Sequence, residues 1–196
     1  DPADWIKTVM VDLVGAYLTC RAFTPGMVEA GWGRVVNISS AASLHPPRIL
    51  NSAYGTSKAA LNQFTRHLAA ELAGTGVTAN VIHPGDLKTA MWADIRSQVE
   101  RLGEIATGYA RWVEWIDKTG GDPIWKAAQL VLDIIGSDAN GRFLWIEDPL
   151  QDPIPSWTPC AQELRWGEEE PRAASVGRAD IAGPVCLQVD SRKDET

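Results

Sequence analysis

Hydrophobic positions recur at helical spacing over residues 54–72, and polar positions fall between them. The apolar positions that share this spacing are Leu61, Phe64, Leu68 and Leu72. Ser52 is suited to cap the start of a helix, and Gly74 with Gly76 is suited to close its end. The pattern therefore predicts a helix that Ser52 caps and that ends near Leu72.

A second helix is expected at residues 2–29, and most of its faces are apolar. Asp1 is suited to cap its start, and Pro2 is suited to its first turn. Its apolar positions are Ile6, Val9, Met10, Leu13, Val14, Tyr17, Leu18 and Phe23. A helix that is apolar most of the way round is buried on more than one side. We therefore expect this helix to be covered on several faces.

Short apolar runs at residues 34–39 and 77–82 have the pattern of strands buried on both faces, as in parallel sheets. Residues 143–146 predict a further strand, after a turn at residues 140–142. Between them, Asp122 and Pro123 predict the start of a helix. The expected inner stripe of this helix consists of Ile124, Ala127, Ala128, Val131 and Leu132.

Composition places the chain among globular proteins, and its 196 residues suffice for one domain with a sizeable core. The net charge of −7 argues against nucleic acid and anionic membranes as partners. No apolar run reaches the ~20 residues of a membrane span. The three scattered cysteines predict reduced thiols in a cytoplasmic protein, and no Cys/His cluster has the spacing of metal ligands.

Tyr54 and Lys58 are the first candidates for chemistry, because residues four apart share one face of a helix. An ammonium beside a phenol favours the phenolate, so the pair has the outline of a proton-transfer device. The same spacing is also common on helices without function. The segments on either side of the pair decide between these readings.

Three segments in order, residues 31–40, 51–64 and 77–89, resemble the second half of a short-chain dehydrogenase/reductase. The resemblance covers roughly residues 1–150 and implies an α/β fold with a Rossmann-like doubly wound parallel sheet. The N-terminal dinucleotide-binding half, with its strand, Gly-rich turn and helix, is missing. A Gly-x-Gly-x-x-Ala match at residues 74–79 follows a helix and is interpreted as a helix end. We therefore expect the sequence to be the C-terminal part of a longer enzyme.

The resemblance implies an NAD(P)-dependent oxidoreductase that interconverts a carbonyl and a secondary alcohol by hydride transfer. It assigns Tyr54 as the general acid or base, Lys58 as a partner that also binds ribose hydroxyls, and Ser40 as the donor to the substrate carbonyl. Ser43 is a weaker rival to Ser40. The pKa of Tyr54, ordinarily ~10, is expected to be lowered by roughly 2–3 units by Lys58 and an oxidised nicotinamide. NAD and NADP both stay open as cofactors, because the discriminating residues belong to the missing half.

Asp12 occupies a position where the family usually has Asn, which helps to hold a water of the proton relay. A carboxylate there is expected to strengthen the ammonium of Lys58 and alter the relay; an ordinary helix carboxylate is the alternative. This departure and the missing half keep open a non-catalytic subunit or fragment with an assembly or cofactor-sensing role. The presence of Ser40, Tyr54 and Lys58 favours the enzyme.

Residues after the strand 77–82 are expected to bind the cofactor, because in the family the backbone after a Pro-Gly pair clasps the nicotinamide carboxamide. The positions assigned in this way are Pro84, Gly85, Leu87 and Thr89, together with Tyr54 and Lys58. Asp86 and Lys88 are expected to face solvent, and His83 is expected to be structural.

Residues 90–119 correspond to the family's substrate lid, where Trp92 is expected to contact the substrate. His45 either lines the same pocket or is merely solvated. Residues 151–196 form a Pro-rich extension, expected to be partly disordered. The resemblance further implies a small-molecule substrate and a homodimer or homotetramer assembled through the helices at residues 2–29 and 54–73.

Overall fold

The computed structural model describes residues 1–44 and 48–146. His45 and the extension at residues 151–196 lie outside the described residues. In chain order the elements are α1 (Pro2–Val9), η1 (Met10–Val14), α2 (Gly15–Glu29), β1 (Gly33–Ile38), η2 (Ala41–Ser43), α3 (Ser52–Glu71), β2 (Val77–His83), α4 (Ala90–Leu102), η3 (Gly103–Ala106), α5 (Thr107–Thr119), α6 (Ile124–Ile135) and β3 (Phe143–Trp145).

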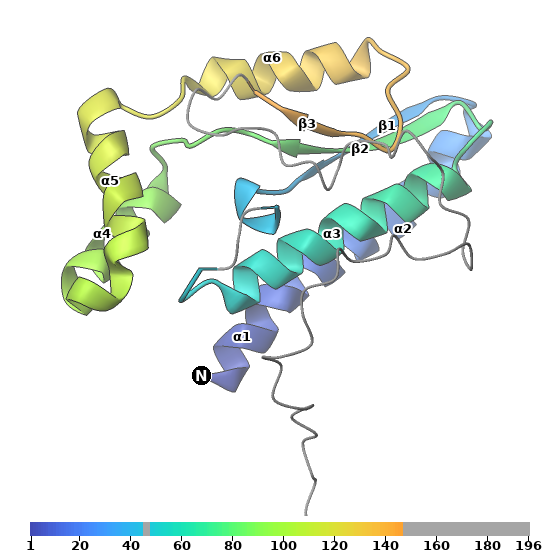
Figure 1. Ribbon diagram of the computed structural model, residues 1–196. Helices are drawn as coiled ribbons and strands as arrows, with labels where there is room; N and C mark the ends of the chain where they lie inside the picture. Colours follow the sequence, from blue (N-terminus) through green and yellow to red (C-terminus); the bar gives the residue numbers. More distant parts are fainter. Residues whose placement is uncertain (45–47, 147–196) are drawn as a thin grey trace, which may run out of the picture. The chain divides into compact units, whose positions relative to one another are not determined.

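The described residues contain a three-stranded parallel sheet in the order β1-β2-β3. In its register Gly33 pairs with Val77, and Val81 pairs with Phe143. Figure 1 shows α2 and α3 against one face of this sheet and α6 against the other. The predicted α/β architecture with helices on both faces of a parallel sheet is therefore confirmed.

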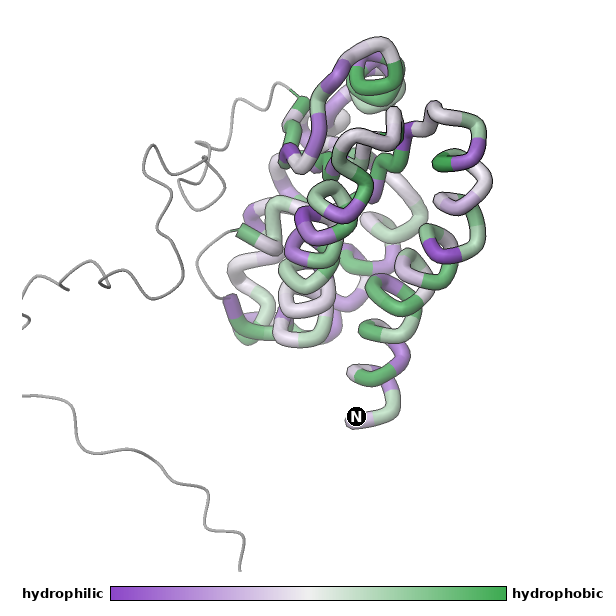
Figure 2. Tube along the Cα trace, turned by 90° about the vertical axis from the view of Figure 1, so that its right-hand side faces the viewer, coloured by the Kyte–Doolittle hydropathy of each residue, from purple (hydrophilic) through white to green (hydrophobic). Residues whose placement is uncertain are grey.

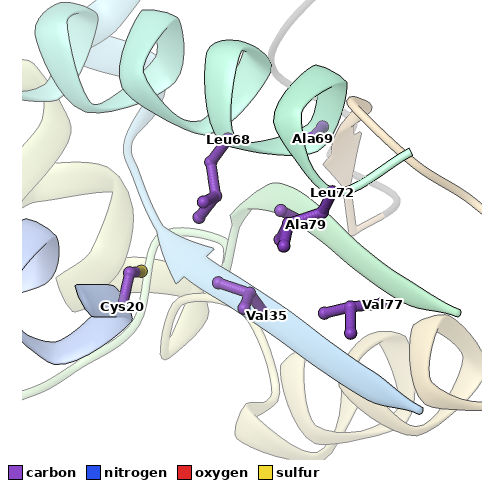
Figure 3. Close-up of a cluster of buried hydrophobic side chains, with 7 residues drawn as sticks. All are labelled: Cys20, Val35, Leu68, Ala69, Leu72, Val77 and Ala79. Atoms are coloured by element: carbon purple, nitrogen blue, oxygen red, sulfur yellow. The ribbon is translucent and has the colours of Figure 1, made fainter. Parts of the chain in front are cut away.

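Apolar side chains between the sheet and the helices α2 and α3 form a hydrophobic core. Figure 3 shows these residues, which come from α2, β1, α3, β2 and the first residue after α3. They are Cys20, Val35, Leu68, Ala69, Leu72, Val77 and Ala79. This packing fixes α3 along the sheet, which determines where the N-terminal turns of α3 lie relative to the end of β1.

The expected helix at residues 2–29 is present as one helical run with a π turn, η1, in its middle. Within the described part of the chain, no side chain of α1 or η1 is buried. Large apolar residues remain exposed along the run: Ile6, Met10, Val11, Leu18 and Phe23. Figure 2 shows hydrophobic positions recurring along this N-terminal helix. A single chain does not provide the expected cover on several faces: the run contacts α3 and β1, and the apolar residues named above stay exposed. Cover of these residues by a second subunit stays a prediction.

Two helix starts differ from the prediction. Asn51, rather than Ser52, is the residue before the first turn of α3. Pro123 occupies the same position before α6, and the Asp122 carboxylate accepts a hydrogen bond from the Asp86 backbone N–H instead of capping the helix. A side chain that finds a tertiary donor is unavailable to its own helix, and sequence pattern does not reveal that donor.

The inner stripe of α6 was also predicted incorrectly. Ile124 is 72% exposed and Leu132 is 60% exposed, whereas Ile134 is 2% exposed. The polar residues of the helix, Lys126, Gln129 and Asp133, recur at helical spacing on one side and so mark an apolar side. Part of that apolar side is nevertheless exposed, because the helix packs through a neighbouring side that carries Ile134.

Gly76 connects α3 to β2 in a conformation that only glycine adopts freely. Its φ is +83°, and a Cβ there would lie 2.0 Å from the Gly31 carbonyl oxygen. Gly76→Ala is expected to lower the free energy of unfolding by about 3 kcal/mol, since the backbone must move. Gly74 has a similar φ of +78° with nothing within 4 Å of its Cβ position. Gly74→Ala is therefore the matched control, with an expected cost of about 1 kcal/mol in the same denaturant titration.

None of the helices in the described residues is both long enough and apolar enough to span a membrane.

Candidate active site

Helix α3 brings Tyr54 and Lys58 to the same side of its first two turns. The Lys58 Nζ atom lies 5.5 Å from the centre of the Tyr54 ring. Tyr54 is half-buried, and only 12% of the Lys58 side chain is exposed. The expected pairing of phenol and ammonium on one helix face is therefore present.

The end of β1 supplies the hydroxyl that meets this pair. The Ser40 side chain is near enough to the Tyr54 phenol to lower its pKa, and its Oγ accepts a hydrogen bond of 3.2 Å from the Ala42 N–H. Its rival Ser43 donates to the Ser40 carbonyl oxygen at 2.6 Å and accepts from Asn62 Nδ2 at 2.8 Å. These hydrogen bonds of Ser43 hold the loop, so Ser40 is the better placed of the two hydroxyls.

Lys58 is held by two acceptors on neighbouring elements. Its Nζ donates to the Ile38 carbonyl oxygen at 3.1 Å and lies 3.2 Å from Asp12 Oδ1. The other carboxylate oxygen of Asp12 accepts a 2.7 Å hydrogen bond from Ser57 Oγ. Ser57 is fully buried one turn after Tyr54. The structure thus brings together all four residues predicted as catalytic: Asp12, Ser40, Tyr54 and Lys58.

The pKa of the Tyr54 phenol is raised above its ordinary value, chiefly because burial disfavours the phenolate. The hydrogen bond from Ser40 lowers the pKa, while the negative charges of Asp12 and Asp86 and the nearby Tyr109 raise it. The expectation that Lys58 lowers this pKa is therefore not met in the chain by itself. The Asp12 carboxylate lies beside the Lys58 ammonium and has the opposite effect on the phenol.

The segment after β2 passes close to the site. His83 is buried, and its Nδ1 accepts a 3.2 Å hydrogen bond from the Ala41 N–H, which supports the predicted structural role. Gly85 has a φ of +91°, and a Cβ there would lie 2.0 Å from Ile146 Cδ1. Only glycine allows the chain to leave the sheet along this path.

Asp86 was expected to face solvent, and this prediction is wrong: the residue is only 9% exposed. Its N–H donates to Asp122 Oδ2 at 2.8 Å, and its carbonyl oxygen accepts from the Asp122 N–H at 2.9 Å. Leu87 forms an antiparallel bridge with Gly121. These backbone contacts, which involve residues more than thirty positions apart, pull the segment inward and fix the path of the expected cofactor-binding residues.

The other two expected cofactor and substrate positions have structural partners. Thr89 caps α4 through a 3.4 Å hydrogen bond that its Oγ accepts from the Trp92 N–H. Trp92 is 6% exposed and packs with Val113 and Ile116 in a separate cluster between α4 and α5. Its indole therefore stabilises the packing of α4 against α5.

Tyr109 is a residue of the site that sequence reasoning missed. It lies on α5, and its hydroxyl donates a 3.0 Å hydrogen bond to Asn51 Oδ1, immediately before α3. Burial raises its pKa, and it contributes to the raised pKa of Tyr54. The only hint in the sequence that Tyr109 could belong to the site was its position within the expected lid at residues 90–119. The spacing between Tyr109 and Tyr54 gave no reason to bring them together.

Comparison with known proteins adds an independent finding. A family model described as short chain dehydrogenase matches residues 1–100. The chain is 32% identical to Nodulation protein G of Azospirillum brasilense over 140 residues, which is 71% of this chain and 56% of that protein. It is 38% identical to the acetoacetyl-CoA reductase of Cupriavidus necator, over 50% of this chain and 39% of the reductase.

Among solved structures, a 3-oxoacyl-[acyl-carrier protein] reductase from Brucella melitensis with bound NAD is 31% identical, with a TM-score of 0.56. The match covers 74% of this chain and 51% of that structure. The chain spans about half the length of the curated relatives that it matches. The order of the three sequence segments, the parallel sheet and the family match agree: this chain belongs to the short-chain dehydrogenase family.

Proposed function

We propose that this chain carries the catalytic segment of an NAD(P)-dependent oxidoreductase that interconverts a carbonyl and a secondary alcohol. The observation that carries the proposal is the geometry around Tyr54: Lys58 Nζ lies 5.5 Å from the centre of the tyrosine ring, and the Ser40 hydroxyl is near enough to lower the pKa of the phenol. A donor hydroxyl, an acid and a cation from two elements thereby meet at the carboxyl end of a parallel strand. This is where open α/β sheets place their ligands.

Each side chain has a defined role in this proposal. Tyr54 donates its phenolic proton to the carbonyl oxygen as that oxygen becomes an alcohol, and it removes the same proton in the reverse direction. Ser40 donates a hydrogen bond to the same oxygen and stabilises the negative charge that develops there. Lys58 holds its charge beside the phenol, and Asp12 is its counter-ion.

NAD or NADP is the proposed cofactor, and when bound it supplies or accepts the hydride. The residues present fit this group. Two acceptors take N–H groups of Lys58, which has three donors in all, so the ammonium is able to bind a ribose hydroxyl as well. The path of Pro84, Gly85 and Leu87 is fixed by the hydrogen bond from Asp86 to Asp122 and by the bridge between Leu87 and Gly121. The proposed role of this segment is to bind the carboxamide through its backbone. The proposed role of Thr89 is a hydroxyl contact beyond its cap.

The proposed substrate is a small carbonyl compound or alcohol, taken up between this site and the lid formed by α4 and α5. Tyr109 is the lid residue that the geometry favours as a substrate contact. Trp92 supports the lid from inside, and the proposed contact by His45 falls outside the described residues. We also propose that the protein is cytoplasmic, because its three scattered cysteines are of the kind that remain reduced thiols.

The test is a nicotinamide absorbance assay on the full-length protein with a panel of small ketones and secondary alcohols. Cofactor-dependent change in absorbance with at least one carbonyl–alcohol pair is the expected result. Dinucleotide binding measured by calorimetry, with no hydride transfer to any member of the panel, would instead favour the non-catalytic cofactor-sensing subunit.

The exposed apolar residues of α1 and α2 support a second copy of the chain as the proposed partner, in a homodimer or homotetramer. The contact would use this run together with α3, as the resemblance implies. Phe23 is 64% exposed and Leu18 is 55% exposed on α2. Phe23→Glu places a charge in this interface and is expected to shift sedimentation toward the monomer. Glu29→Lys, an exposed charge change on the same helix, is the control that should leave the oligomer intact.

A further inference from the structure

Asp12 lies in the π turn that interrupts the N-terminal helix. Residues Met10–Val14 form this turn, and the Gly15 N–H donates to the Met10 carbonyl oxygen five residues earlier. Single π turns within α-helices occur frequently at functional sites, because they turn one side chain away from its regular position. Here the residue within the turn is a carboxylate that meets the helix bearing Tyr54.

Both carboxylate oxygens of Asp12 are used by consecutive residues of α3. Oδ1 lies 3.2 Å from Lys58 Nζ, and Oδ2 accepts a 2.7 Å hydrogen bond from Ser57 Oγ. The exposed fractions of the two charged side chains are 18% for Asp12 and 12% for Lys58. A pair so far removed from water interacts more strongly than a surface ion pair. Ser57 fixes the carboxylate so that it faces the ammonium.

Four elements bring titratable groups to the Tyr54 phenol. Lys58 comes from α3 itself, Asp12 from the π turn, Asp86 from the segment after β2, and Tyr109 from α5. The cation Arg48 acts on Tyr109, and the ring of His83 is directed to the backbone of η2. Among the described residues, two carboxylates, Asp12 and Asp86, therefore oppose the ammonium of Lys58 near the phenol. Of the two, Asp12 touches the ammonium directly.

We propose that Asp12 is a positioning residue whose carboxylate offsets the charge of Lys58, so that Tyr54 remains protonated and the site favours proton donation to a carbonyl oxygen. This inference rests on the proposed function and deepens it, because it assigns carbonyl reduction as the direction for which the resting site is prepared. In that direction the carbonyl carbon gains the hydride that a bound reduced dinucleotide would supply, and the phenolic O–H bond breaks as its proton joins the oxygen of the substrate. The phenolate that remains recovers a proton from solvent. An amide at position 12 would leave the ammonium free to stabilise the phenolate.

The test is the ultraviolet titration of the phenol in Asp12→Asn, which needs neither cofactor nor substrate. The chain has three tyrosines, and subtracting the same titration of the Tyr54→Phe variant isolates Tyr54. At a fixed pH below the midpoint, Asp12→Asn is expected to raise the phenolate fraction of Tyr54 by about threefold or more, because an anion is removed and a cation is unmasked. Near-ultraviolet circular dichroism defines the pH range in which each variant stays folded.

Asp4→Asn is the matched control, since it removes one exposed negative charge from the same helical run and leaves the phenol titration unchanged. Ser57→Ala keeps the Asp12 charge and is expected to change the phenolate fraction less than Asp12→Asn does. Asp12→Ser also lacks the carboxylate and gives the same test if the amide variant does not fold. A phenolate fraction in both charge-removing variants equal to or below that of the wild type would overturn the inference.

The pH dependence of the rate provides a second readout. In Asp12→Asn the rate of alcohol oxidation, which needs the phenolate, is expected to reach its plateau at lower pH than in the wild type. The two proposals remain distinguishable. A shifted titration in a protein without hydride transfer supports the role of Asp12 and refutes the oxidoreductase, whereas an active enzyme with an unshifted titration refutes the role of Asp12 alone.

Discussion

Tyr54→Phe in the full-length protein is expected to reduce turnover by about 10³-fold or more, while the affinity for dinucleotide changes little. The substitution removes a single oxygen atom and keeps the ring that packs 5.5 Å from Lys58 Nζ. It therefore removes the proton donor and the partner of Ser40 without opening a cavity. The turnover number from the nicotinamide absorbance assay and the dissociation constant from calorimetry check the two parts of the expectation.

Tyr17→Phe is the matched control for this substitution. Tyr17 packs edge-on against Phe64 at 5.9 Å between ring centres, and its hydroxyl accepts a hydrogen bond from Arg21 on the exposed side of α2. Losing that hydroxyl is expected to leave turnover within a factor of two or so, since exposed hydrogen bonds contribute little. Retention of wild-type turnover by Tyr54→Phe would overturn the assignment of the acid.

Leu61→Ala is expected to lower the free energy of unfolding by about 2–5 kcal/mol. Leu61 is 2% exposed on the inner face of α3, so truncation leaves a cavity that neighbouring residues fill only in part. Because α3 carries Ser57 and Lys58 as well as Tyr54, the loss should also loosen the catalytic constellation. Denaturant unfolding at constant pH measures the change.

Leu132→Ala provides the corresponding control on α6. Leu132 is 60% exposed, so its truncation is expected to alter the free energy of unfolding by no more than about 0.5 kcal/mol. Similar losses for the two variants would contradict the burial of Leu61. A loss at Leu132 alone would mean that another surface covers α6 in the full-length protein.

Most of the secondary structure followed from the sequence because its patterns depend on neighbours in the chain. The apolar runs at residues 34–39 and 77–82 predicted β1 and β2 to within one residue at each end. The helix around Leu61 and Leu68 also ended close to the expected place, because glycines follow it. Assignments of inner and outer faces were less successful, as the exposed Ile124 and Leu132 on α6 show.

The candidate site was predicted in outline because its main sequence signals are also local. The spacing of Tyr54 and Lys58 is a property of one helix, and Ser40 follows directly from the end of a strand. The contacts of Asp86 with Asp122 and of Tyr109 with Asn51 join residues far apart in the chain. Local pattern carries no information about such contacts, so the burial of Asp86 and the position of Tyr109 required coordinates.

The sequence by itself determined the family, most of the elements and the candidate for the acid, because these depend on residue types at fixed spacings. Only the tertiary structure decided the electrostatic state of that acid. Burial, the Ser40 hydroxyl and the negative charge of Asp12 act on the Tyr54 pKa through space, from elements that the chain order separates. The direction of the shift is a sum over these neighbours, and their distances exist only once the helices have packed against the sheet.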